Sequence, residues 1–130
     1  MRRFLLTSLA LMPLLAACAS STNLAGQPPR VIFFGEEGTS LDDAAKAVIA
    51  DAANLAKANP LAPVRVLGFA DPEGSVAYNR ALSRARAENV AEALREDGVP
   101  AGRIIVGARG PVPFEAIALE SRRVEIRVGL

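Results

Sequence analysis

Two residues of opposite charge, Asp71 and Arg86, have the types and spacing that most directly suggest binding chemistry in this sequence. Arg86 falls in the apolar stripe of a predicted helix, beside Leu82 and Val90, where an unpaired guanidinium would cost several kilocalories per mole. Asp71 stands in the loop just before that helix. We expect the two charges to face outward together around a space for a zwitterion, whose ammonium Asp71 binds and whose carboxylate Arg86 binds. The alternative is that the two side chains simply satisfy each other at the sheet edge.

The elements that must position these charges are a strand and a long helix. Residues 64–70 read as a buried strand, and the loop 71–75 leads into a helix over 76–97. Gly98 is predicted to end this helix in the left-handed conformation, with Pro100 two residues later. At 100° per residue the charged side chains of the helix gather opposite the apolar stripe, as a solvated face; they are Arg80, Arg84, Glu88, Glu92 and Arg95.

The rest of the pattern completes a small α/β domain. Strands are predicted over 31–34, 103–108 and 123–128, the last alternating between charged and β-branched residues. A helix is predicted over 41–58, with Ser40 and Asp43 as a capping box, and 107–110 reads as a turn leaving the third strand. The order strand, helix, strand, helix, strand, strand predicts a two-layer α/β sandwich with both helices on one face.

Composition excludes several classes of function. The 130 residues contain no histidine and a single cysteine, Cys18, which removes the commonest general base and metal ligand. The formal charge of +1 and the mixed signs along the chain argue against nucleic acid as a partner. The carboxylate pairs at 36–37 and 42–43 have no nucleophile, base or metal set near them. We therefore expect no enzyme, no cofactor and no metal.

The N-terminus has the pattern of a bacterial lipoprotein. A basic start and an apolar run predict a signal peptide over 1–17, too short to span a membrane. It ends in Leu-Ala-Ala-Cys, which resembles a lipobox and would place acyl chains such as palmitate on Cys18; an ordinary signal peptide is the alternative. Residues 18–30 read as the lipidated cysteine and a linker, and 31–130 as the domain. Without aspartate after Cys18, the outer membrane is the expected location, with the domain facing the periplasm.

Residues 68–87 resemble the signature of the OmpA-like domain, which the peptidoglycan-associated lipoproteins share. In that family a Gly-His-x-Asp-x-x-Gly turn precedes an Asn and then Leu-Ser-x-x-Arg-Ala. Here Gly68, Asp71 and Gly74 form the turn, and Asn79 and Arg86 match without a gap. Further similarities include Phe34, Leu41, Gly98-Val99-Pro100, Arg103 and the closing 122–126, so the resemblance covers about residues 31 to 128.

The resemblance implies a mixed four-stranded sheet and non-covalent binding of the peptidoglycan stem peptide. Asp71 would meet the ammonium of its diaminopimelate residue and Arg86 the carboxylate, while Asn79 orients the loop. Phe69 replaces the family's His at the mouth, or is simply a strand residue facing the core; Arg122 is a further candidate ligand-binding residue. Ser121 replaces the usual Asn, and the segment from Gly110 to Arg122 is compact. The expected function is a tether between outer membrane and wall; the alternative is a protein-interaction scaffold of the envelope that has lost wall binding.

Overall fold

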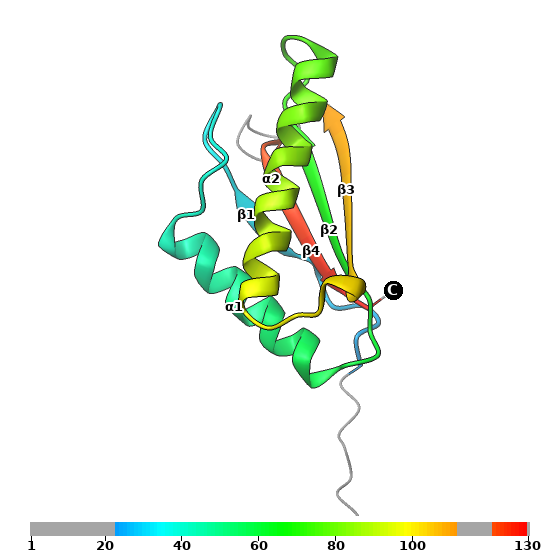
Figure 1. The fold of residues 1–130 in the computed structure, drawn as a ribbon. Helices are drawn as coiled ribbons and strands as arrows, with labels where there is room; N and C mark the ends of the chain where they lie inside the picture. Colours follow the sequence, from blue (N-terminus) through cyan, green and yellow to red (C-terminus); the bar gives the residue numbers. More distant parts are fainter. Residues whose placement is uncertain (1–22, 112–120, 130) are drawn as a thin grey trace, which may run out of the picture.

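Two helices cover one face of a four-stranded sheet in the computed structural model, which describes residues 23–111 and 121–129 (Figure 1). The predicted signal peptide and Cys18 lie outside the described residues, as does most of the segment between Gly110 and Arg122. In chain order the elements are β1 (Arg30–Phe33), α1 (Asp43–Ala58), β2 (Val64–Ala70), α2 (Val76–Glu96), the short 3-10 helix η1 (Ala101–Arg103), β3 (Ile104–Pro111) and β4 (Arg123–Val128).

The strand order across the sheet is β1-β4-β2-β3. The strand β2 pairs in parallel with β3, to which α2 connects it, and antiparallel with β4. The strand β4 also pairs antiparallel with β1 at the other edge. This arrangement confirms the predicted two-layer sandwich with a mixed four-stranded sheet and both long helices on one face.

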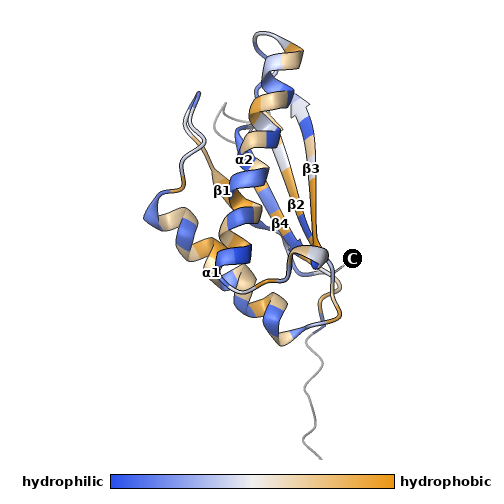
Figure 2. Cartoon of the chain, in the orientation of Figure 1, coloured by the Kyte–Doolittle hydropathy of each residue, from blue (hydrophilic) through white to orange (hydrophobic). Residues whose placement is uncertain are grey.

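The core lies between the helices and the inner face of the sheet, where Figure 2 shows the hydrophobic residues. Each strand of the central pair turns alternate residues inward, and α1 contributes mostly alanines, whose small side chains let it lie close to the sheet. The fully or almost fully buried members are Ile49, Ala52, Ala53, Ala56, Val64, Val66, Ala87, Val90, Leu94, Val124 and Ile126.

The close approach of α2 to β2 requires the glycine at position 68. A Cβ atom built on Gly68 would lie 2.0 Å from the carbonyl oxygen of Ser83 in α2, a distance that no side chain can occupy. Because Gly68 lies near the end of β2, the first half of α2 is held directly against that end of the sheet. The two segments that carry Asp71 and Arg86 are thereby brought together.

Three local predictions are wrong in detail. Asp42, not Ser40, caps α1, because its carboxylate accepts from the amide of Ala45 at 2.7 Å. The third strand continues through the predicted turn to Pro111, with an irregularity in its pairing opposite Gly68/Phe69 and Gly110 in a left-handed conformation. The second helix stops at Glu96, one residue before its expected end, with Gly98 at a φ of 98° as predicted.

The first described residues and the charged loop after β2 lie at opposite ends of the sheet. Leu24 packs against the core, and the amide of Gly129, just after β4, donates to the carbonyl of Pro63, just before β2. Asp71 follows the other end of β2. The seven residues of β2 separate these ends by about 23 Å, at roughly 3.3 Å per residue.

Candidate functional site

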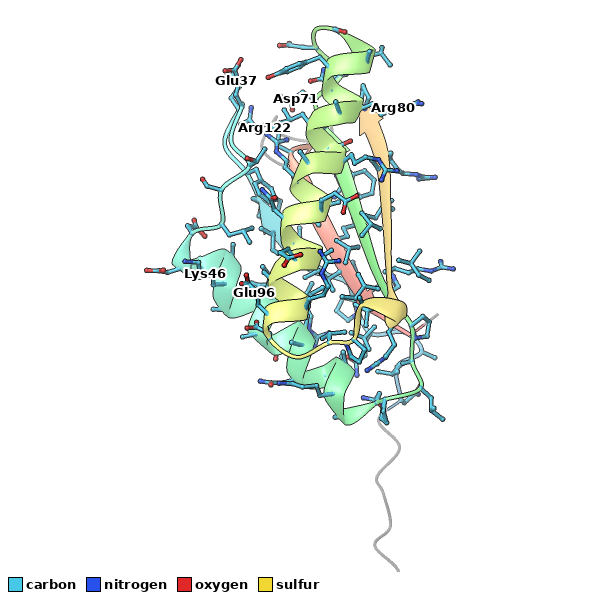
Figure 3. The ribbon with its side chains drawn as sticks, in the orientation of Figure 1. Glu37, Lys46, Asp71, Arg80, Glu96 and Arg122 are labelled. Atoms are coloured by element: carbon cyan, nitrogen blue, oxygen red, sulfur yellow. The ribbon has the colours of Figure 1, made fainter. Side chains whose placement is uncertain are left out.

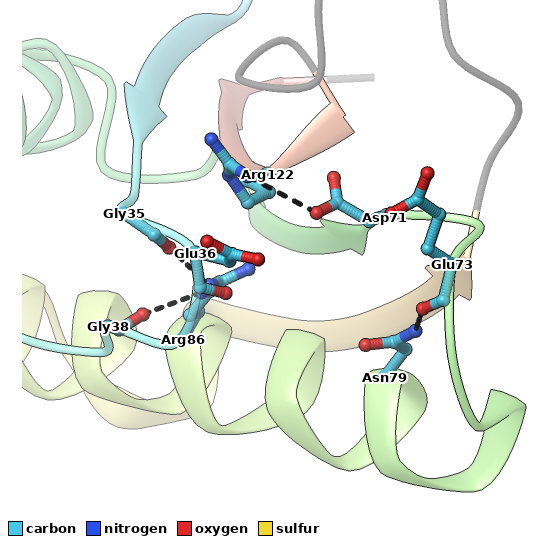
Figure 4. Close-up of polar contacts among 8 residues, drawn as sticks. All are labelled: Gly35, Glu36, Gly38, Asp71, Glu73, Asn79, Arg86 and Arg122. Carbon is cyan, nitrogen blue, oxygen red and sulfur yellow. Dashed lines mark hydrogen bonds and ion pairs between the residues drawn. The ribbon is translucent and has the colours of Figure 1, made fainter.

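Asp71 lies where β2 ends and is held by Arg122, the residue just before β4. Its Oδ2 accepts from Nη1 of Arg122 at 3.3 Å, and the two side chains are 18% and 17% exposed. Figure 4 shows the pair above the body of α2. The second carboxylate oxygen, Oδ1 of Asp71, is buried and has no hydrogen-bond partner in the part of the chain that the structure describes. Asp71 therefore keeps one acceptor available.

Arg86 is buried beneath the turn that joins β1 to α1. Its Nε donates to the carbonyl of Gly38 at 2.8 Å, and its Nη2 donates to Gly35 and Glu36 at 2.7 and 3.1 Å. The guanidinium also stacks over the ring of Phe34, 5.2 Å from its centroid. The whole residue is 0% exposed, and its Nη1 has no partner among the described residues.

The geometry agrees neither with the expectation that both charges face outward nor with the alternative that they pair with each other. Asp71 and Arg86, both among the described residues, form no ion pair with each other: Oδ2 of Asp71 accepts from Arg122, whereas Nε and Nη2 of Arg86 donate to backbone carbonyls. Arg86 also does not face outward. The three carbonyls that cover it come from positions about 50 residues earlier in the chain, and no local pattern around Arg86 indicates them.

The three charges form a cluster with one more positive than negative group. Burial lowers the pKa of Arg86 from its ordinary value, and the positive charge of Arg122 lowers this pKa further, while Asp71 and Tyr78 raise it. Arginine stays protonated in proteins despite such shifts. Because Arg122 opposes the charge on Arg86, a negatively charged group bound between them would relieve both.

Asn79 fixes the loop that carries Asp71. It is buried in the first turn of α2, and its Nδ2 donates to the carbonyl of Glu73. At the start of the helix, the hydroxyl of Ser75 accepts from the amide of Tyr78 at 3.3 Å and so caps α2. Figure 4 shows Asn79 beneath this loop, in the position needed to orient it.

Phe69 is not brought together with the other candidates. Gly68 faces α2, so its neighbour Phe69 points from the opposite face of the sheet. There the ring is buried under the guanidinium of Arg123, 4.0 Å from the ring centroid. Phe69 thus lies on the far side of the sheet from Arg86 and is not part of the helix-side core.

Four buried polar atoms without partners mark the site. They are Oδ1 of Asp71, Nη1 of Arg86, Nε of Arg122 and the hydroxyl of Ser121, and none has a hydrogen bond within the described residues. An unsatisfied buried polar atom costs about 1–3 kcal/mol, so proteins seldom leave several in one place without a function. In the sequence, Ser121 differs from the family's Asn only by its shorter side chain. No local pattern indicates that Ser121 is buried beside Arg122.

The four unpartnered atoms offer a ligand one acceptor, two charged donors and a hydroxyl. An ammonium suits the free oxygen of Asp71, and a carboxylate suits the free nitrogens of Arg86 and Arg122. The described residues contain no group of three or more acidic or cysteine side chains arranged to hold a metal ion. No helix in residues 23–111 and 121–129 is long and apolar enough to cross a bilayer.

Comparison with known proteins identifies the same architecture. Residues 33–123 match the OmpA family. The probable lipoprotein YiaD of Escherichia coli K12 is 32% identical over 113 residues, which are 82% of this chain and 52% of that protein. The peptidoglycan-associated lipoprotein of Legionella pneumophila is 40% identical over 79 residues, 56% of this chain and 45% of that protein. This chain therefore aligns with about half the length of each relative.

A solved structure agrees with the fold and with the sequence matches. The crystal structure of the peptidoglycan-associated lipoprotein from Burkholderia pseudomallei superposes with a TM-score of 0.70 and 27% sequence identity. The alignment covers 76% of this chain and 89% of that one. The resemblance seen in residues 68–87 is thus confirmed over most of the domain.

Proposed function

The chain belongs to the OmpA family, and from this membership together with the charges around Asp71 we propose that it binds peptidoglycan without covalent attachment. Two of its relatives are named peptidoglycan-associated lipoproteins. The single observation that carries the proposal is the set of unpartnered buried atoms on Asp71, Arg86 and Arg122. A binding role needs no nucleophile or proton-transfer pair, and the chain is proposed to act as a tether, not as an enzyme.

The proposed ligand group is the free amino-acid centre of diaminopimelate in the stem peptide. Its ammonium would bind Oδ1 of Asp71, while Oδ2 stays with Arg122. Its carboxylate would bind Nη1 of Arg86 and Nε of Arg122, which supplies the negative charge that the cluster lacks. Arg122 then has two roles, because it positions Asp71 and also faces the ligand.

Binding requires a small opening of the structure above Arg86. Arg86 is 0% exposed, and the turn whose carbonyls accept from its guanidinium lies on it. Gly35 and Gly38 in this turn have no side chain, and because glycine adopts a wide range of backbone conformations, the turn can change conformation at these two positions. Opening the turn would uncover Nη1 of Arg86 for a ligand.

The lipid anchor is part of the same proposal. Acylation of Cys18 would attach the chain to the outer membrane and leave the domain in the periplasm, where it would meet the wall. Two or three acyl chains give effectively permanent anchoring, since each buried methylene contributes about 0.8 kcal/mol. Cys18→Ser should then move the protein from the membrane fraction to the soluble fraction of lysed cells; unchanged membrane association would contradict the anchor.

Full burial of Arg86 favours a second candidate, a scaffold for envelope proteins that no longer binds the wall.

Sedimentation with peptidoglycan sacculi distinguishes the wall-binding tether from the scaffold. Detergent-purified protein should sediment with sacculi, and Asp71→Asn should weaken retention at least about tenfold through the loss of one charge-assisted contact. Glu96→Gln is the matched control, since it makes the same change toward the other end of α2 (Figure 3).

The outcome is read from the difference between the two variants. Equal retention of wild type, Asp71→Asn and Glu96→Gln would remove Asp71 from the binding site, and no retention of any of them would remove the wall-binding proposal and leave the scaffold. Loss confined to Asp71→Asn supports the wall. Thermal unfolding of each variant verifies that the domain remains folded.

A further inference from the structure

The sheet face turned away from the helices carries a positively charged hollow. Gly68 faces α2, so its alternate neighbours Arg65 and Leu67 point to the other side of β2. In the paired strands, Arg127 lies opposite Arg65 in β4, and Ile105 lies opposite Arg65 in β3. This surface is on the far side of the sheet from Arg86 and independent of the site around Asp71.

The hollow has an apolar floor because a side chain is missing from β3. Gly107 lies opposite Leu67, and a Cβ added to it would come within 3.0 Å of the Leu67 side chain. The resulting cavity has a volume of about 310 Å³ and is lined by Arg65, Val66, Leu67, Ile105, Gly107, Glu125 and Arg127. That volume is at the lower end of the range for small-ligand sites and accommodates one or two side chains.

The rim places two arginines directly against each other. Arg65 and Arg127 are cross-strand neighbours, an arrangement that is destabilising for like charges. Both are exposed, and neither forms an ion pair with any residue that the structure describes. The acid in the lining, Glu125, accepts from Arg123 at 2.9 Å and does not neutralise them. The repulsion would be relieved by a bound anion.

We propose that this hollow docks an acidic segment of a partner protein. An apolar side chain of the segment would lie over Gly107 and Leu67, beside Ile105, which is 53% exposed. Carboxylates on either side of it would pair with Arg65 and Arg127. Charge and shape favour this occupant over two others: a second copy in a symmetric contact would set arginines against arginines, and a flat bilayer surface does not fill a concave apolar floor.

A peptide with fluorescein on its N-terminus, fluorescein-Glu-Glu-Leu-Glu-Glu-amide, tests the proposal by anisotropy with the full chain in neutral detergent. We expect saturable binding that raised salt weakens, and at least tenfold weaker binding when glutamine replaces each glutamate or glycine replaces leucine in the peptide. The double variant Arg65→Gln/Arg127→Gln should lose at least tenfold in affinity. Gly107→Leu, which fills the hollow, should abolish the preference for leucine over glycine.

Matched controls and competing outcomes keep the test decisive. Arg84→Gln/Arg95→Gln removes two arginines from the exposed face of α2 and should bind the peptide like wild type. Equal losses in both double variants would overturn the proposal, as would absence of peptide binding. It is equally overturned if vesicles containing phosphatidylglycerol, but not the peptide, bind in a manner that depends on Arg65 and Arg127, or if sedimentation shows dimers that the same variant dissociates.

Discussion

Arg86→Met separates the part that Arg86 plays in stability from its part in binding. Methionine is flexible, has no donors and replaces the aliphatic part of the arginine side chain, so the change removes the hydrogen bonds while keeping the packing of that part. In the structure, Arg86 donates to three carbonyls of the turn between β1 and α1. We expect this variant to fold, with a lower free energy of unfolding even when no ligand is present.

The expected loss follows from the three acceptors. Each buried carbonyl that loses its partner costs about 1–3 kcal/mol, but Gly35 and Glu36 are exposed residues, so water can reach part of the turn. Removing Arg86 also relieves the cost of burying a charge with an unpaired Nη1. We expect a net loss of about 3 kcal/mol, which a domain of typical stability, about 5–15 kcal/mol, survives.

Urea unfolding followed by circular dichroism measures this loss, with Arg84→Met as the matched control. Arg84 is 57% exposed and pairs with Glu88, so the control should change stability by no more than about 0.5 kcal/mol. Asp71→Asn should stay within about 1 kcal/mol, because an amide oxygen can still accept from Arg122. If Arg86→Met were as stable as the control, the carbonyl contacts would not hold the turn, and the covered state of Arg86 would not be the state in solution.

Four other substitutions test the fold, each by urea unfolding. Gly68→Ala should cost about 3 kcal/mol or more, because its Cβ would meet the Ser83 carbonyl at 2.0 Å; a loss below about 1 kcal/mol would contradict the close packing of α2 on β2. Asp42→Ala should cost about 1 kcal/mol and Ser40→Ala almost nothing, whereas the reverse order would restore Ser40 as the cap. Arg103→Met should cost about 2 kcal/mol, because Arg103 in η1 donates to the carbonyls of Ala56, Asn59 and Ala62 in and just after the last turn of α1. An unchanged midpoint would mean that those bonds do not tie this end of α1 to η1.

The elements that could be predicted are those whose signals are local. The strand over 64–70 matches β2, the alternating residues 123–128 match β4, and Gly98 ends α2 in the left-handed conformation. Hydrophobic period and the conformational freedom of glycine act within a few residues, so one chain is enough to read them. The motif around Asp71 likewise identified the family that the comparisons confirm.

The features that could not be predicted depend on segments distant in sequence. The helical period shows Arg86 as a charge in an apolar stripe, but the carbonyls that accept from it lie in the turn 35–38. The partner of Asp71 is likewise distant in sequence, at Arg122. The strand order β1-β4-β2-β3 also arises from pairing between distant segments. Ser40 and Asp42 compete for the same helix start, and propensity alone does not distinguish one capping residue from another two positions away.

The two ends of β2 would bear opposite loads if lipid is attached at Cys18 and the wall at Asp71. Leu24 and Gly129 lie at the Pro63 end, and the backbone between Cys18 and Leu24 can span at most about 20 Å. Tension between membrane and wall would therefore run lengthwise through β2 and β4, across hydrogen bonds that lie perpendicular to the strands. Shear in that direction strains the whole ladder at once, so the sheet would resist being pulled open one bond at a time.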